Sequence, residues 1–97
     1  MLKYAKTRGG TVKVTFALPS DEIDQPVSVL GDFNDWDPHA HPLRRRSNGT
    51  RSAVVELESG TVARFKYLRA DGTWFCEPDA ESVTHDEYDV VDSLLAV

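Results

Sequence analysis

The chain of 97 residues lacks the features that mark secreted, membrane-spanning and disulfide-stabilised proteins. Its single cysteine, Cys76, excludes an internal disulfide and is typical of a reducing compartment, so we expect a cytoplasmic protein. No run of 18 apolar residues is present, and the first residues lack the apolar stretch of a secretory signal, so we expect no membrane partner. The length suits one domain over residues 1–97, with a core over about 10–97 and a short basic extension over 1–9.

Basic residues are too few to dominate the surface. The formal net charge is −5, which argues against nucleic acid as a partner because nucleic-acid binders usually present a basic face. Residues 71–97 hold eight Asp or Glu and no Lys or Arg, a charge of −8, whereas residues 1–70 hold all 11 bases and the other eight acids, a charge of +3. The acidic end either packs beside the basic part of the chain or forms a surface for a protein partner.

Motifs of common catalytic sites are also missing. The sequence has no glycine-rich phosphate loop, no zinc-ligand spacing and no nucleophile elbow. An acidic neighbour of Cys76 disfavours a reactive thiolate. The side chains of Asp35, Asp37, His39 and His41 can ligate a metal, but the prolines at 38 and 42 are more typical of a solvated loop. We therefore expect no enzyme activity, no cofactor and no metal site.

Short segments along the chain have the pattern of β-strands. Residues 11–18, 26–31 and 61–69 each have the pattern of a β-strand, and Pro19 ends the first of them. The apolar faces of the first and third segments are formed by Val12, Val14, Phe16 and Leu18, and by Ala63, Phe65 and Tyr67. Such faces predict strands that are buried on one side.

Turn signals join these segments. Asn48-Gly49 between residues 43–46 and 51–57 predicts a hairpin, and Asp71-Gly72 predicts another that leads to residues 73–76. The apolar spacing beyond residue 82 fits both a helical stripe and a terminal strand, with the strand favoured. Short strands with a turn signal about every ten residues predict an all-β sandwich.

The stretch Gly31-Asp32-Phe33-Asn34-Asp35-Trp36 sets two aromatic residues among turn formers. Each ring either fills the core or is held out for a ligand, because a large ring left in water loses the stabilisation that burial gives. Trp36 and Trp74 both lie in or beside loops, and flat rings exposed in pairs suit sugars, whose C–H faces stack on an indole. Lys66 points away from the apolar face of its segment and can donate hydrogen bonds to hydroxyls. Core filling stays the alternative for each tryptophan.

The segments together resemble a known family. The spelling Gly31-x-Phe33-Asn34-x-Trp36, followed by Phe65-Lys66-Tyr67 and Asp71-Gly72-Thr73-Trp74, is similar to the glycogen-binding module of AMP-activated protein kinase beta subunits. It also resembles the isoamylase N-terminal (early-set) domains of starch and glycogen enzymes, which belong to family 48 of the carbohydrate-binding modules. The resemblance covers roughly residues 10 to 97.

The resemblance implies an immunoglobulin-like antiparallel β-sandwich of about seven to eight strands that ends in a strand. It implies non-catalytic binding of glycogen- or starch-like α-1,4-glucan, with Trp36 and Trp74 as stacking rings and Lys66 as donor. Phe33 matches the buried partner of the first ring. In the last loop Tyr88 would replace an apolar residue, Val90 a threonine and Asp92 an asparagine. Asp92 accepts hydrogen bonds but cannot donate them.

These changes in the last loop leave an alternative function open. Each lost hydrogen bond weakens binding by roughly 0.5–1.5 kcal/mol. The altered loop and the acidic end would also suit a module that docks on a glycan-metabolising enzyme or kinase and binds sugar weakly.

Overall fold

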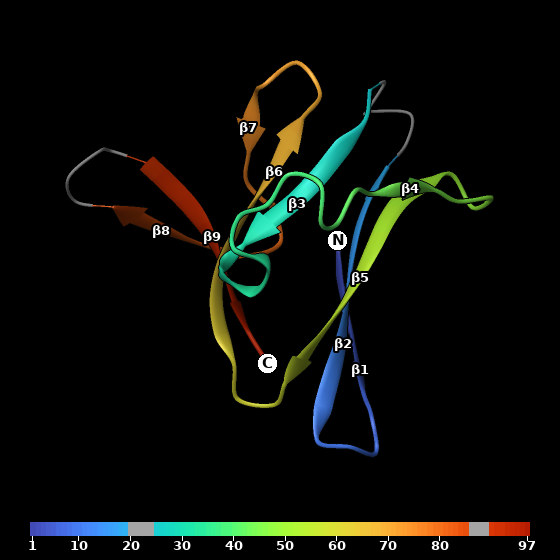
Figure 1. Cartoon of the computed structure of the whole chain (residues 1–97), viewed down its shortest axis with the longest axis vertical. Coiled ribbons are helices and arrows are strands. Elements are labelled where there is room, and N and C mark those ends of the chain that lie inside the picture. The colour runs from blue at the N-terminus through green and yellow to red at the C-terminus, as the bar shows by residue number, and fades with distance from the viewer. Residues whose placement is uncertain (20–24, 86–89) are drawn as a thin grey trace.

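Two antiparallel sheets make up the structure (Figure 1), a computed structural model that describes residues 1–19, 25–85 and 90–97, apart from the side chains of 83–85 and 90. In these ranges the strands are β1 (Leu2–Lys6), β2 (Thr11–Pro19), β3 (Val27–Gly31), β4 (Arg44–Arg45), β5 (Thr50–Glu58), β6 (Val62–Arg69), β7 (Trp74–Phe75), β8 (Glu81–His85) and β9 (Val90–Ala96). A single turn of 3-10 helix, η1, spans Asp32–Asn34. The predicted β-sandwich is confirmed.

The strand order separates the two sheets clearly. One sheet has the order β1-β2-β5-β4, and the other has the order β3-β6-β9-β8, with β7 also paired to β6. Figure 1 shows these two groups of strands on opposite sides of the view. The described residues form nine strands rather than the expected seven to eight, partly because β4 and β7 are only two residues long.

Strand β1 lies within the segment expected to be an extension. Leu2–Lys6 pairs antiparallel with Val12–Phe16 of β2 and so forms an edge of the first sheet. Only Leu2 of this strand is even partly buried. An edge strand with exposed side chains carries no apolar alternation, which is why the sequence pattern gave no sign of it.

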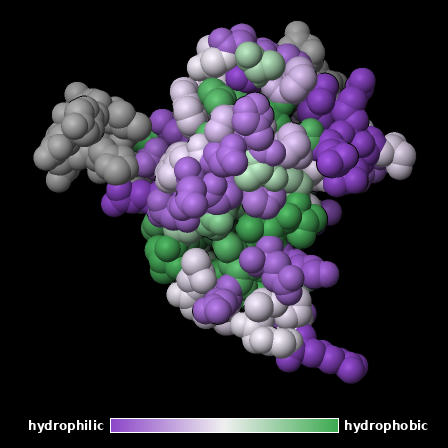
Figure 2. Space-filling view, in the orientation of Figure 1, coloured by the Kyte–Doolittle hydropathy of each residue, from purple (hydrophilic) through white to green (hydrophobic). Residues whose placement is uncertain are grey.

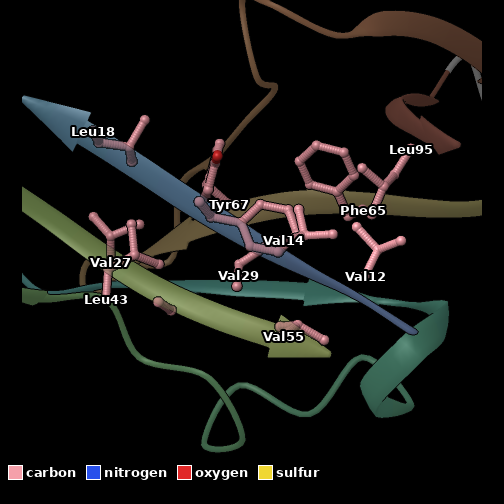
Figure 3. Packing of buried hydrophobic residues seen from close by; sticks show 12 residues of the cluster. Val12, Val14, Leu18, Val27, Val29, Leu43, Val55, Phe65, Tyr67 and Leu95 are labelled. Atoms are coloured by element: carbon pink, nitrogen blue, oxygen red, sulfur yellow. The ribbon is translucent and has the colours of Figure 1, made fainter. Parts of the chain in front are cut away.

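The core lies between the two sheets and is built from the predicted faces. Phe16 of β2 meets Phe65 of β6 with ring centroids 5.1 Å apart, and it meets Tyr67 at 6.5 Å, both edge to face. Figure 3 shows Phe65, Tyr67 and Val14 pointing into this shared interior, with Leu95 of β9 beside Phe65. Because alternate residues of β6 point inward, the residues between them must face outward.

One end of the core contains a buried acid. Glu77 is 2% exposed, and its Oε1 accepts a hydrogen bond of 3.0 Å from the Tyr67 hydroxyl. The Glu77 backbone N–H donates to Ser93 Oγ at 2.8 Å. Burial of the phenol, together with the Glu77 charge, raises the pKa of Tyr67 far above its ordinary value of 10. Tyr67 is therefore held neutral in the folded protein.

Both predicted hairpins are present, and a glycine closes each turn. Gly49 N–H donates to Arg46 O, and Gly72 N–H donates to Arg69 O at 2.9 Å. Both glycines have positive φ, 82° and 89°, a conformation that side chains disfavour. These turns explain why the Asn-Gly and Asp-Gly spellings were informative.

The end of the chain is a strand, as the resemblance implied. β9 pairs with β8 on one side and, through Ser93–Ala96, with β6 on the other. Apolar residues gather in the middle of the face seen in Figure 2, where the two sheets meet in Figure 1. Among the described ranges there is no helix long and apolar enough to span a membrane.

Candidate functional site

Four of the five residues predicted to bind sugar line one hollow of about 330 Å³, namely Trp36, Lys66, Trp74 and Asp92. They come from the loop after η1 and from β6, β7 and β9. Tyr88, the fifth predicted residue, lies outside the described residues. The fold thus brings together side chains that are up to 56 positions apart in the sequence.

Strand alternation places this hollow on the outer face of the second sheet. Lys66 lies between the inward residues Phe65 and Tyr67, which are both fully buried. Trp74 of β7 pairs with Leu68 of β6, two residues beyond Lys66 and therefore on the same face. The strands that build the core thus also set the spacing of the site.

Lys66 and Asp92 form a shielded ion pair at this site. Lys66 Nζ lies 3.9 Å from Asp92 Oδ1, and their side chains are only 15% and 5% exposed. A separation of 3.9 Å is too long for a hydrogen bond but short enough for charge attraction. The carboxylate therefore balances the lysine charge without accepting a hydrogen bond from it, and within residues 1–19, 25–85 and 90–97 no other group accepts one, so the ammonium can donate to hydroxyls.

Trp36 has an unusual backbone conformation. Asp35 and Trp36 both lie in the left-handed region, with φ of 55° and 56°. Aspartate tolerates this region, whereas it is rare for a bulky side chain and costs of the order of 1–3 kcal/mol. The Trp36 N–H donates to Gly31 O at 3.0 Å, which holds the turn closed. Strain of this kind often accompanies functional residues, because a binding side chain is placed where packing alone would not put it.

Asp32 fixes the Trp36 ring, and sequence reasoning missed this residue. Trp36 Nε1–H donates to Asp32 Oδ1 at 3.1 Å, while the Arg64 backbone N–H donates to Asp32 Oδ2 at 2.9 Å. One carboxylate thus ties the loop and its indole to β6. The contact with Arg64 joins residues 32 positions apart, so no local pattern could reveal it.

Phe33 and Asn34 anchor the same loop from inside. The Phe33 ring lies 5.7 Å from that of Phe16 and packs against the core, as its predicted role as a buried partner requires. Asn34 Oδ1 accepts from Gly31 N–H at 3.0 Å, and Asn34 Nδ2 lies 2.9 Å from His41 Nδ1. His41 thus supports the loop. Over the described parts of the chain, no group of three or more His, Cys, Asp or Glu side chains could hold a metal.

Gly31 is required at its position by close packing and not by φ, which is −170°. A Cβ added there would lie 2.6 Å from Arg64 O and 2.9 Å from Phe65 Cβ. Contacts below 3.0 Å essentially never occur for a real Cβ. At Gly31, where β3 ends and the loop that carries Trp36 begins, the chain is therefore in direct contact with the β6 backbone.

Trp74 follows a turn that is closed by hydrogen bonds. Its side chain is 47% exposed, so a large part of the indole is available to a ligand. Before it, Asp71 Oδ1 accepts hydrogen bonds from the Thr73 hydroxyl at 2.6 Å and from the Thr73 N–H at 3.0 Å. These bonds from Thr73 lower the pKa of Asp71, which keeps the carboxylate charged and the turn intact.

The arrangement suits binding of a ligand with flat apolar faces and polar edges. Two indoles offer C–H stacking surfaces, and the ion pair offers a donor and an acceptor between them. A shallow hollow with these groups matches the chemistry of a sugar ring.

Comparison with known proteins agrees with this chemistry. The family described as the glycogen recognition site of AMP-activated protein kinase matches residues 9–97. The chain is 45% identical over 56 residues to the 1,4-alpha-glucan branching enzyme GlgB 2 of Xanthomonas campestris pv. campestris, which covers 57% of this chain and 8% of that enzyme. It is 43% identical over 47 residues to the 1,4-alpha-glucan branching enzyme GlgB of Synechococcus elongatus, which covers 47% of this chain and 6% of that enzyme. The chain thus spans less than a tenth of the length of these relatives.

Proposed function

Because the chain belongs to the family of the glycogen recognition site of AMP-activated protein kinase, we propose that it binds glycogen-like α-1,4-glucan in the hollow between its two tryptophans. The observation that carries this proposal is the convergence of Trp36, Lys66, Trp74 and Asp92 on one outer face. The names of the relatives, 1,4-alpha-glucan branching enzymes, favour the same class of ligand.

Each residue has a distinct role in the proposal. Trp36 and Trp74 stack on the C–H faces of glucose units. Lys66 donates hydrogen bonds to sugar hydroxyls, and Asp92 accepts from them while it balances the lysine charge. Tyr88 would add an apolar contact from the last loop, a role that stays a prediction.

The module acts by binding and not by chemistry. Nothing in the proposed site calls for a covalent step, since stacking and hydrogen bonding suffice to hold a sugar. A single shallow site gives modest affinity, which a polymeric ligand raises only if a second site is tethered nearby. Attachment of such a module to a glucan-acting enzyme would supply that tethering.

A glycogen pull-down with a double variant tests the proposal. Trp36→Ala with Trp74→Ala should abolish retention on glycogen, while circular dichroism and thermal unfolding show a folded domain. The matched control is Tyr4→Ala, which removes an exposed aromatic (53% exposed) from the other sheet and should bind as the wild type does. Where the double variant is unfolded, the more exposed Trp74→Ala alone is the deciding variant.

Two results would overturn the proposal. Retention of the folded double variant at the wild-type level would show that the indoles are not the binding surface. Failure of the wild type to bind glycogen would remove the sugar function and favour the alternative of docking on a glycan-metabolising enzyme or kinase.

A further inference from the structure

A second hollow of about 370 Å³ lies on the same face of the second sheet, beside the proposed sugar site. Its lining includes Pro26, Ser28, Pro38, His39, Leu68 and Gly72. Ser28 of β3 pairs directly with Leu68 of β6, and two residues further along β3 Leu30 pairs with Lys66, which lines the first hollow. The register therefore sets the two hollows next to each other along β6.

The same two elements border both hollows. β6 contributes Lys66 to the first and Leu68 to the second, and these residues are about 7 Å apart along the strand. The loop after η1 contributes Trp36 to the first hollow, and Pro38 and His39 to the second. A ligand that leaves the first hollow in this direction has no intervening strand to cross.

Trp74 lies at the boundary between the hollows. It lines the first hollow, and it pairs in the sheet with Leu68, which lines the second. A chain of sugar units that stacks on the Trp74 ring and extends across the sheet from β7 to β6 therefore reaches Leu68. This continuity decides what the second hollow would hold.

The chemistry of the second hollow also suits a sugar unit. Leu68, Pro26 and Pro38 offer apolar surface for C–H faces. Ser28 and His39 offer a hydroxyl and an imidazole, which donate or accept hydrogen bonds. Neither of these two side chains hydrogen-bonds to the protein within the part of the chain that the structure describes, so both are available to a ligand.

We propose that the second hollow is an extension of the glucan site, which holds further glucose units of the chain bound at Trp36 and Trp74. Ser28 and His39 bond the hydroxyls of these units, and Leu68 packs against them. The module then selects longer linear segments over short oligosaccharides. The inference rests on the proposed function of the first hollow.

The test compares maltotriose with maltoheptaose, each titrated into the complete chain and followed by calorimetry and amide shifts. Maltotriose fits one hollow, whereas maltoheptaose can reach both. The double change Ser28→Ala and His39→Ala should weaken maltoheptaose binding by about fivefold to 150-fold, through two lost hydrogen bonds, and leave maltotriose affinity unchanged. In the wild type, amide signals of Ser28 and His39 should shift with maltoheptaose and not with maltotriose.

The outcomes separate this inference from the proposed function. Equal losses for both sugars, or no loss for either, would overturn the extension while the first hollow keeps its role. Shifts at Ser28 and His39 as large with maltotriose as with maltoheptaose would also overturn it. Wild-type protein that binds neither sugar would overturn both proposals together, and the Tyr4→Ala control should match the wild type throughout.

Discussion

Replacement of Trp74 by alanine should weaken glucan binding strongly and leave stability nearly unchanged. The side chain is 47% exposed, and a tryptophan has up to roughly 250 Å² to bury, so about 120 Å² faces solvent. A glucose unit stacked on one ring face covers about half of that, ~60 Å², which is worth about 1.5 kcal/mol at ~25 cal/mol per Å². The sugar face buries a similar area.

The two contributions together set the expected size of the effect. A loss of between about 1.5 and 3 kcal/mol of binding free energy corresponds to an increase in Kd of about tenfold to 150-fold for Trp74→Ala. The urea-unfolding free energy should fall by less than about 1 kcal/mol, because the ring is largely outside the core.

Isothermal calorimetry with maltoheptaose is the assay for this variant, with Tyr4→Ala as the matched loss of an exposed aromatic ring. An unchanged Kd would refute the assignment of Trp74 to the site. A fall of 3 kcal/mol or more in the free energy of unfolding would also refute this assignment, because it would show that the Trp74 ring stabilises the fold.

Three further predictions concern the parts that hold the site and the core. Asp32→Asn should lower the free energy of unfolding by about 0.5–1.5 kcal/mol and weaken sugar binding, because an amide leaves either the Trp36 indole N–H or the Arg64 N–H without a protein acceptor; wild-type urea unfolding and binding would contradict this. Gly31→Ala should lower the free energy of unfolding by about 1–3 kcal/mol or more, because the added Cβ collides with β6. The control Gly9→Ala, whose added Cβ would meet no atom nearer than 4.0 Å, should leave stability nearly unchanged. Equal unfolding midpoints for the two variants would show that no steric clash occurs at Gly31. Because burial and Glu77 raise the pKa of Tyr67, the neutral phenol stabilises the fold fully below pH 10 and progressively less above it. The free energy of unfolding should thus fall by up to about 1.4 kcal/mol per pH unit above pH 10, and less steeply in Tyr67→Phe; identical slopes would contradict it.

Much of the fold was accessible from sequence because long parts of its strands, β6 above all, follow a period of two. The inward set Ala63, Phe65 and Tyr67 was predicted from alternation and is buried in the structure. The Asn-Gly and Asp-Gly pairs located two hairpins, because glycine adopts the positive φ that these turns require more readily than other residues do. β1 was missed because an exposed edge strand has no such pattern.

Only part of the candidate site could be predicted from the sequence. Trp36, Lys66 and Trp74 could be proposed from local spacing and from the family resemblance, but their convergence depends on the pairing of distant strands. The Asp32 contact with Arg64 and the ion pair of Lys66 with Asp92 join residues 32 and 26 positions apart. Contacts of this kind depend on the register in which distant strands pair, and that register cannot be read from a single sequence.

The most direct test of the proposed glucan site is a titration of the chain with maltoheptaose, followed by the indole Nε1–H signals of its two tryptophans. We predict that both indole signals shift and saturate at the same sugar concentration, while amide signals of β1 on the other sheet stay in place. If neither indole signal moves at millimolar sugar, Trp36 and Trp74 do not bind glucan and the account is wrong.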